Sequence, residues 1–244
     1  MIRLSASAFD VVWHDLGLGR VPVPLAVPSV GATEAERAAV REEVYRGLTD
    51  RGLFDGRLAP DLETRLRLLD GGTRYVACEA LVDMTADAPF RAVTAVRGRG
   101  GVLAVQPERT VGLSAIREGE LVSAIVAVLP ELSAGPGFGV NLPATAFDST
   151  ADSGSGWDSA SASVARQVEE VAAIQARPVF AAGQFSVYAR DNGRLTRCGG
   201  LTWFDTDAGA YSAGVSGGRG GQDWVNVAPV DGPRLVERVL ALFG

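Results

Sequence analysis

Few side chains in this sequence could carry out the common reactions of enzymes. The chain of 244 residues has one histidine and two cysteines. His14 is far in sequence from any serine or cysteine in an activating context, and a catalytic base needs a positioned partner. One histidine and two distant cysteines cannot form a recognised zinc set. We therefore expect neither a catalytic nor a metal site, and we interpret His14 as a surface or boundary residue.

Two further motifs each lack a required part. The acidic pair Asp205 and Asp207 does not have EF-hand spacing, and it is typical of a hairpin turn closed by Gly209. The glycine clusters at 135–139 and 217–221 do not lie between a strand and a helix with the Lys-Ser/Thr pair of a phosphate loop. We interpret both clusters as turns and expect no cofactor.

Long apolar runs and an excess of positive charge are also absent. No apolar run approaches the ~20 residues that cross a bilayer, and the N-terminal residues lack the apolar segment of a signal peptide. The 23 basic against 29 acidic side chains give a net charge of −6, which opposes attraction to nucleic acid or anionic lipid. We expect a cytoplasmic protein. Cys78 and Cys198 fall in strand-like runs, and we interpret both as small apolar core residues.

What the chain does contain is a stretch that recurs. Residues 110–129 and 224–243 both begin with alternating apolar residues and continue with apolar spacings of three and four, so each predicts a strand followed by a helix. At a fixed offset their apolar positions coincide: Val111 with Val225, Leu113 with Val227, Ile116 with Val230, Leu121 with Leu235, Val122 with Val236 and Ala127 with Ala241. We interpret this as one supersecondary unit used twice; the alternative is chance likeness between two amphipathic helices.

The remaining patterns predict helices and antiparallel hairpins. Serines before Phe9 begin a short helix that stops at Gly17, and a capping box at Thr33 and Glu36 begins another. The predicted elements are helices from residues 34, 60 and 164, one ending at 129 and one ending the chain, with strands at 74–84, 90–97, 101–106, 110–114, 179–190, 195–204, 210–215 and 224–228. Consecutive hairpins with helices before and after them favour an α+β fold.

The chain divides at a segment of small polar residues. Between 147 and 163 the composition is mainly Ser, Asp, Gly, Ala and Thr, which is typical of a flexible linker. We therefore expect an N-terminal half at 1–147, a linker at 148–163 and a C-terminal half at 164–244. Each half then reads helix, four strands, helix.

Motifs in both halves resemble those of the EspG family of type VII (ESX) secretion in actinobacteria. The likeness covers nearly the whole chain and depends on the order of the motifs. They are the runs 9–19, 22–25, 31–37 and 51–53 in the first half, and Gly183-Gln184, Phe204-Asp205-Thr206, Gly209, Tyr211 and 225–229 in the second.

The resemblance implies one EspG-like domain, with a central antiparallel sheet built from two quasi-symmetric halves and flanked by helices. It implies a non-enzymatic cytosolic chaperone that binds the apolar helical tip of the PPE subunit of a PE–PPE heterodimer, keeps it soluble and delivers it for export. We expect a monomer or weak homodimer. Two other classes stay open: a small-ligand-binding α+β protein, and a hydrolase or transferase of unrecognised type.

The resemblance also implies that the second group of strands carries the partner contact. If Phe185, Val187 and Ala189 point into the core, alternate residues of the same strand point outward. The predicted partner-binding residues are Gln184, Ser186, Tyr188, Arg190, Thr196 and Thr202. The simpler alternative is an ordinary solvated sheet face.

Overall fold

The fold is a single sheet with helices on both faces. A computed structural model describes residues 1–85, 87–146, 159–217 and 222–244. Its ten strands follow the order β1-β5-β4-β3-β2-β7-β8-β9-β10-β6, and every pair of neighbouring strands is antiparallel. The strands are β1 (Ile2–Ser5), β2 (Arg74–Leu81), β3 (Phe90–Arg97), β4 (Gly100–Gln106), β5 (Thr110–Arg117), β6 (Val140–Pro143), β7 (Val179–Asp191), β8 (Arg194–Thr206), β9 (Gly209–Gly217) and β10 (Asp223–Pro229). The predicted α+β class is confirmed.

The strand order is symmetric about the junction of β2 with β7. Each half contributes four consecutive antiparallel strands, β2 to β5 and β7 to β10, and each set is followed by a helix. Outside them, β1 pairs with β5 and β6 pairs with β10, so an edge strand lies at each end of the sheet, although β6 belongs to the N-terminal half of the chain. This order confirms the expected central sheet of two quasi-symmetric halves.

Local sequence signals begin most of the helices. Ser5 caps α1 by accepting a hydrogen bond from the amide of Ala8 at 3.1 Å, and Thr33 with Glu36 forms the predicted capping box of α2. Asp231 caps α6 by accepting from the amide of Arg234 at 2.9 Å. The helices are α1 (Ala6–Asp15), α2 (Glu34–Asp50), α3 (Pro60–Gly71), α4 (Ser123–Val126), α5 (Ser159–Gln175) and α6 (Gly232–Ala241).

Some elements differ from the predictions. The edge strands β1 and β6 were not predicted, because four residues are too few for alternation to be recognised. The helix predicted up to residue 129 is reduced to α4, which spans only Ser123–Val126. Helix α5 begins at Ser159, so residues 159–163 of the expected linker are helical, and residues 148–158 lie outside the described residues.

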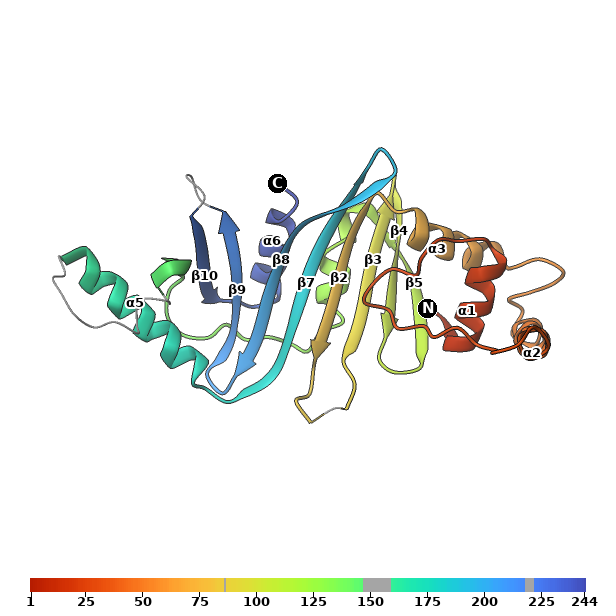
Figure 1. Ribbon diagram of the computed structural model, residues 1–244, viewed down its shortest axis with the longest axis horizontal. Coiled ribbons are helices and arrows are strands. Elements are labelled where there is room, and N and C mark those ends of the chain that lie inside the picture. Colours follow the sequence, from red (N-terminus) through yellow and green to blue (C-terminus); the bar gives the residue numbers. More distant parts are fainter. Residues whose placement is uncertain (86, 147–158, 218–221) are drawn as a thin grey trace.

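The two sheet faces are covered differently. On the first face, α4 and α6 pack together over a core that includes Phe185, Trp203 and Leu235. On the second face, α1 and α3 cover strands of the first half, and α5 packs over β6 and β10 through Val171. Helices α1–α3 and α5 lie at opposite ends of the long axis of the molecule (Figure 1). The middle of the second face therefore lies between these helices and is open.

Candidate functional site

A row of side chains crosses the uncovered middle of the second face. Strand register places Glu79 of β2 opposite Gln184 of β7, Gln184 opposite Thr202 of β8, and Thr202 opposite Ala213 of β9. Cross-strand partners share a face, so all four side chains lie on one side of the sheet. We call these residues, together with Ser186, the central strip.

The central strip contains two hollows that share residues. One has a volume of about 420 Å³ and is bordered by β7, β8, β9 and β10, and the other, of about 310 Å³, lies over β2, β7 and β8. Gln184 and Thr202 line both hollows, and both side chains are exposed. Two of the predicted residues therefore lie where the two hollows meet, at the centre of the strip.

Strand β7 has the facing that the alternation predicts. Phe185 and Val187 are fully buried in the core under α4 and α6. Gln184 and Ser186 lie on the opposite face, with Ser186 half-buried beside Gly200 of β8. Three of the predicted partner-binding residues, Gln184, Ser186 and Thr202, are thus brought together, and their role in binding stays a prediction.

Tyr188 and Arg190 share this face but serve the packing of α3. Tyr188 is half-buried against the core beneath α1 and α3. The guanidinium of Arg190 donates to the carbonyls of Asp70 and Gly72, each at 3.0 Å, and to the Tyr75 hydroxyl at 3.1 Å. A cation at a helix C-terminus satisfies carbonyls that have no partner within the helix. Arg190 therefore holds the end of α3 on the sheet, and Tyr188 packs against the core of this end.

Thr196 points to the other face because β8 contains a bulge. The register pairs Val187 with Gly199 but Tyr188 with Arg197, so one residue, Cys198, is extra. An extra residue reverses the facing of the strand beyond it. Thr196 consequently pairs with Ala189, away from Thr202. The same bulge leaves Cys198 exposed, so our interpretation of this cysteine as a core residue was wrong, whereas Cys78 is buried.

Sequence reasoning missed several residues that border the larger hollow. These are Arg197, Gly200, Ala213, Val215 and Val225. Alternation along β9 and β10 could have found the apolar members, since Ala213 and Val215 are two residues apart. The Gly199-Gly200 pair was a signal for the bulge, because glycine inside a strand often marks one.

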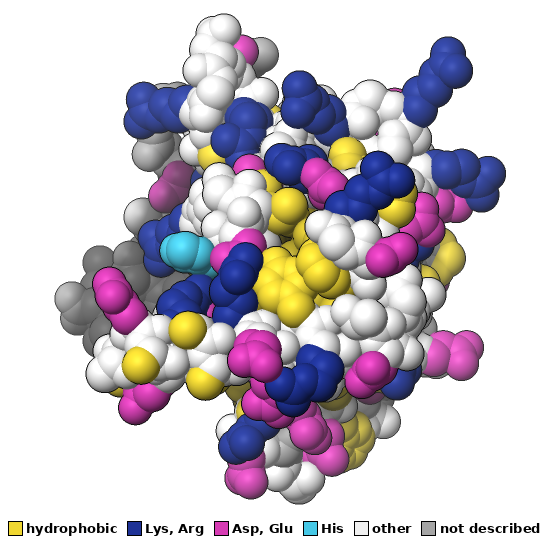
Figure 2. All heavy atoms as spheres, turned by 90° about the vertical axis from the view of Figure 1, so that its right-hand side faces the viewer, with side chains coloured by type: hydrophobic (Ala, Val, Ile, Leu, Met, Phe, Trp, Pro, Cys, Tyr) yellow, Lys and Arg dark blue, Asp and Glu magenta, His cyan; other side chains and the backbone are white. Residues whose placement is uncertain are grey.

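A third hollow lies at the other end, among α2 and the loop after it. It has a volume of about 520 Å³ and is lined by Ala38, Arg41, Glu42, Tyr45, Phe54 and Gly56. Figure 2 shows this end of the molecule, where apolar side chains gather near the centre within a border of both charges. The Tyr45 and Phe54 rings meet edge to face at 4.6 Å between centroids. The aromatic lining is therefore partly used in internal packing.

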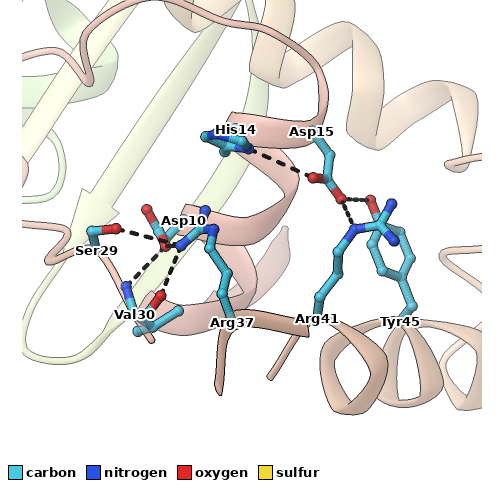
Figure 3. A network of polar contacts seen from close by, with 8 residues as sticks. All are labelled: Asp10, His14, Asp15, Ser29, Val30, Arg37, Arg41 and Tyr45. Carbon is cyan, nitrogen blue, oxygen red and sulfur yellow. Dashed lines mark hydrogen bonds and ion pairs between the residues drawn. The ribbon is translucent and has the colours of Figure 1, made fainter. Parts of the chain in front are cut away.

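Ion pairs join α1 to α2 beside this hollow (Figure 3). Asp15 accepts hydrogen bonds from Arg41 Nε at 2.7 Å and from the Tyr45 hydroxyl at 2.8 Å. Burial raises the pKa of the Asp15 carboxyl, but these hydrogen bonds together outweigh it and hold that pKa below its ordinary value. Burial, and then the bond to Asp15, raises the pKa of Tyr45 to about 12. Both shifts move the pKa away from neutral pH, so Asp15 stays ionised and Tyr45 stays protonated at pH 7. The network joins α1 to α2 through these groups.

Within the part of the chain that the structure describes, no group of three or more His, Cys, Asp or Glu could hold a metal ion. Across the same described ranges, no helix has both the length and the apolar character of a membrane span. His14 is exposed, with 71% of its side-chain surface accessible, as expected, and its Nδ1 lies 3.7 Å from Asp15.

Comparisons with known proteins agree with this fold. A search among curated proteins finds no significant match. A similar solved structure is the Mycobacterium tuberculosis type VII secretion system chaperone EspG5 in complex with the PE25–PPE41 dimer; the TM-score is 0.71 with 16% sequence identity, over 99% of this chain and 95% of that chain. The sequence pattern of the EspG family matches residues 5–241. Because this match spans nearly the whole chain, the protein belongs to the EspG family.

Proposed function

We propose that this protein is a non-enzymatic cytosolic chaperone of a type VII secretion system, which binds a PE–PPE heterodimer, keeps it soluble and delivers it for export. Family membership supports the proposal. So does the likeness in fold to EspG5, which was solved with a PE25–PPE41 dimer. The observation that carries it is the central strip, a region of sheet between the helices of the second face, of which only the Ala213 end packs against the buried cluster beneath α5.

The dimensions and composition of the strip suit the apolar helical tip of a PPE subunit. From Glu79 to Ala213 the row crosses four adjacent strands, about 14 Å at the usual strand spacing. A helix with its side chains is ~10 Å across, so one helix end fits this width. Gly200, Ser186 and Ala213 are small, which allows close approach, and Gln184 and Thr202 can donate and accept hydrogen bonds.

An ion pair at one end of the strip would limit where an apolar tip can bind. Arg91 Nε donates to Glu79 Oε1 at 3.1 Å, so the two charges on β2 and β3 compensate each other. Towards β9 and β10 the row becomes apolar, with Ala213, Val215 and Val225. We therefore place the apolar tip over β7 to β9, with its polar border near Glu79.

A double variant with one change on β7 and one on β8 tests this surface. We expect Gln184→Arg combined with Thr202→Arg to reduce the affinity for the client at least 100-fold, because two long cations would block and charge the centre of the strip. The probes are PE–PPE heterodimers encoded in the same genome, co-expressed with the chain and measured by co-purification and calorimetry. Exposed substitutions usually change stability by only ~0.5 kcal/mol, so the thermal transition should be nearly unchanged.

Thr64→Arg is the control, since it places the same side chain at an exposed position of α3, outside the central strip and outside the open end of β8. It should bind the client normally. The double variant avoids Tyr188, because a change there would also disturb the half-buried contact beneath α3. Normal client binding by the folded double variant would overturn the proposed site, and failure of every PE–PPE pair to bind the unmodified chain would overturn the proposed function.

A further inference from the structure

The sheet is incompletely paired between β8 and β9. Only Thr202–Thr206 of β8 pairs with β9, although β8 begins at Arg194 and β9 continues to Gly217. In the first half the corresponding strands, β3 and β4, pair along their length, from Arg91 to Arg97. Figure 1 shows β8 and β9 separating towards the upper side of the view. The second half of the sheet therefore contains a fork that the first half lacks.

One side of the fork is an open strand edge. Residues 194–200 of β8 pair with β7 on one side, and no described strand pairs with them on the other. In an antiparallel strand alternate residues direct both their N–H and C=O groups away from a given neighbour. Arg194 to Cys198 are all exposed. The edge consequently offers backbone donors and acceptors to an added strand.

The fork has room for the backbone of such a strand. The hollow of about 420 Å³ lies here, and its walls include Gly199, Gly200 and Gly214. Glycines inside strands are typical of places where another backbone approaches closely. A Cβ atom at Gly199 would lie 3.1 Å from Leu242, so the residue after α6 closes the back of the fork. Leu201 and Val215 add apolar surface to the lining.

The charge beside the open edge is positive. The guanidinium of Arg197 lies over Gly200, at the hollow. Neither Arg194 nor Arg197 has a carboxylate within ion-pair distance in the described parts of the chain. An arginine without a partner is available to bind a carboxylate in a bidentate manner. An incoming segment with an acidic side chain would therefore be favoured over a basic one.

We propose that the open edge of β8, residues 194–200, takes up an extended segment of the PE–PPE client by strand addition, with an acidic side chain of that segment on Arg197. This inference rests on the proposed function, because the larger hollow is continuous with the central strip through Gln184 and Thr202. Backbone pairing gives affinity in this mode of recognition, and side-chain pockets give specificity. A client held at both places would be bound by its helical tip and by an extended segment beside it.

Amide hydrogen exchange of the full chain, alone and with a bound PE–PPE heterodimer, tests the strand addition. We expect exchange at alternate amides among residues 195–200 to slow at least tenfold in the complex, because each newly paired N–H must open before it exchanges. We also expect Arg197→Glu to weaken client binding about tenfold, a change of roughly 1.4 kcal/mol. Arg197→Lys should bind more tightly than Arg197→Glu, because it keeps the charge.

Arg20→Glu is the control for the change in net charge. Arg20 is exposed and lies outside the fork, so this variant should bind like the unmodified chain. Client binding without slower exchange at residues 195–200 overturns strand addition and leaves the proposed function standing. Slower exchange with unchanged affinity in Arg197→Glu overturns the acidic contact. Failure of every PE–PPE pair to bind overturns the proposed function itself.

Discussion

The indole of Trp203 lies directly against Gly183 on the neighbouring strand. The two residues are cross-strand partners, and a Cβ atom at position 183 would lie 2.7 Å from Trp203 Nε1 and 2.6 Å from the Cβ of Ala80. Trp203 is fully buried, and its indole N–H, which faces the thiol of Cys78, has no nitrogen or oxygen acceptor in the described structure. The indole is therefore positioned by packing, and the missing side chain of Gly183 leaves the space that the ring occupies.

Gly183→Ala should lower the free energy of unfolding by about 2 kcal/mol, because adding a methyl group to a packed core forces its neighbours to move. Gly47→Ala is the matched control. Position 47 lies within α2 with nothing within 4 Å of the added Cβ, so this variant should gain about 0.5–1 kcal/mol from helix propensity. Urea denaturation of both variants measures the difference. Equal effects would show that Trp203 can move without cost.

Arg190→Ala should destabilise the protein by about 2 kcal/mol, because three acceptors around the end of α3 would lose a charged donor. Arg190→Lys should restore only part of this stability, since an ammonium cannot reproduce the guanidinium fork. Arg194→Ala, four residues further on and exposed, should leave the thermal transition unchanged. A shift in the Arg194 variant as large as that of Arg190→Ala would contradict this assignment.

The stabilising effect of Asp15 should disappear in acid. Its pKa in the folded protein is below the ordinary 3.8, so the unfolded chain binds the proton more readily and stability falls as pH falls from 3.8 through the folded pKa. At pH 7 we expect Asp15→Asn to cost about 1 kcal/mol, a modest value because the pair is partly screened by solvent. Unfolding curves of both proteins between pH 2 and 7, at roughly unit steps, should converge at the acidic end. A gap that stays constant with pH would contradict the role of the charge.

The two cysteines should differ in reactivity with iodoacetamide. Cys198 is exposed at the bulge, whereas burial raises the pKa of the Cys78 thiol to about 12. Because the thiolate is the nucleophile, the native protein should take up one label per chain at Cys198. Mass spectrometry after labelling in 6 M guanidinium, roughly the concentration that unfolds even stable domains, should show two labels. Labelling of Cys78 in the native protein would indicate that the core beneath α6 opens.

The sequence predicted the elements that carry their own local signals. The capping box of Thr33 and Glu36 marked the start of α2, and the alternation at 90–97 marked β3 at its observed bounds. Strands β1 and β6 were missed because each is held by its partner, β5 or β10, and such long-range pairing leaves no local pattern. The facing of Phe185 followed from alternation, since β7 is regular there.

The candidate site was predicted only where the local alternation of a strand decides which way a side chain faces. Gln184 and Ser186 follow the period of two, so their place on the central strip could be predicted from the strand itself. The position of Thr196 did not follow from this period, because the bulge at Cys198 reverses the facing of the residues before it in β8. The use of Arg190 by α3 depends on a helix on the order of a hundred residues earlier in the chain, which no local pattern shows.

The junction of β2 with β7 joins two strands that the ribosome makes at different times. Strand β2 pairs on one side with β3, which follows it closely, but its other partner is made only on the order of a hundred residues later. On the ribosome, the first half therefore exists for several seconds with β2 as an unpaired edge strand, given ~5–20 residues added per second. Premature pairing of that edge with another nascent chain would give a misfolded product. A protein proposed to guard others from aggregation would thus pass through an aggregation-prone stage of its own.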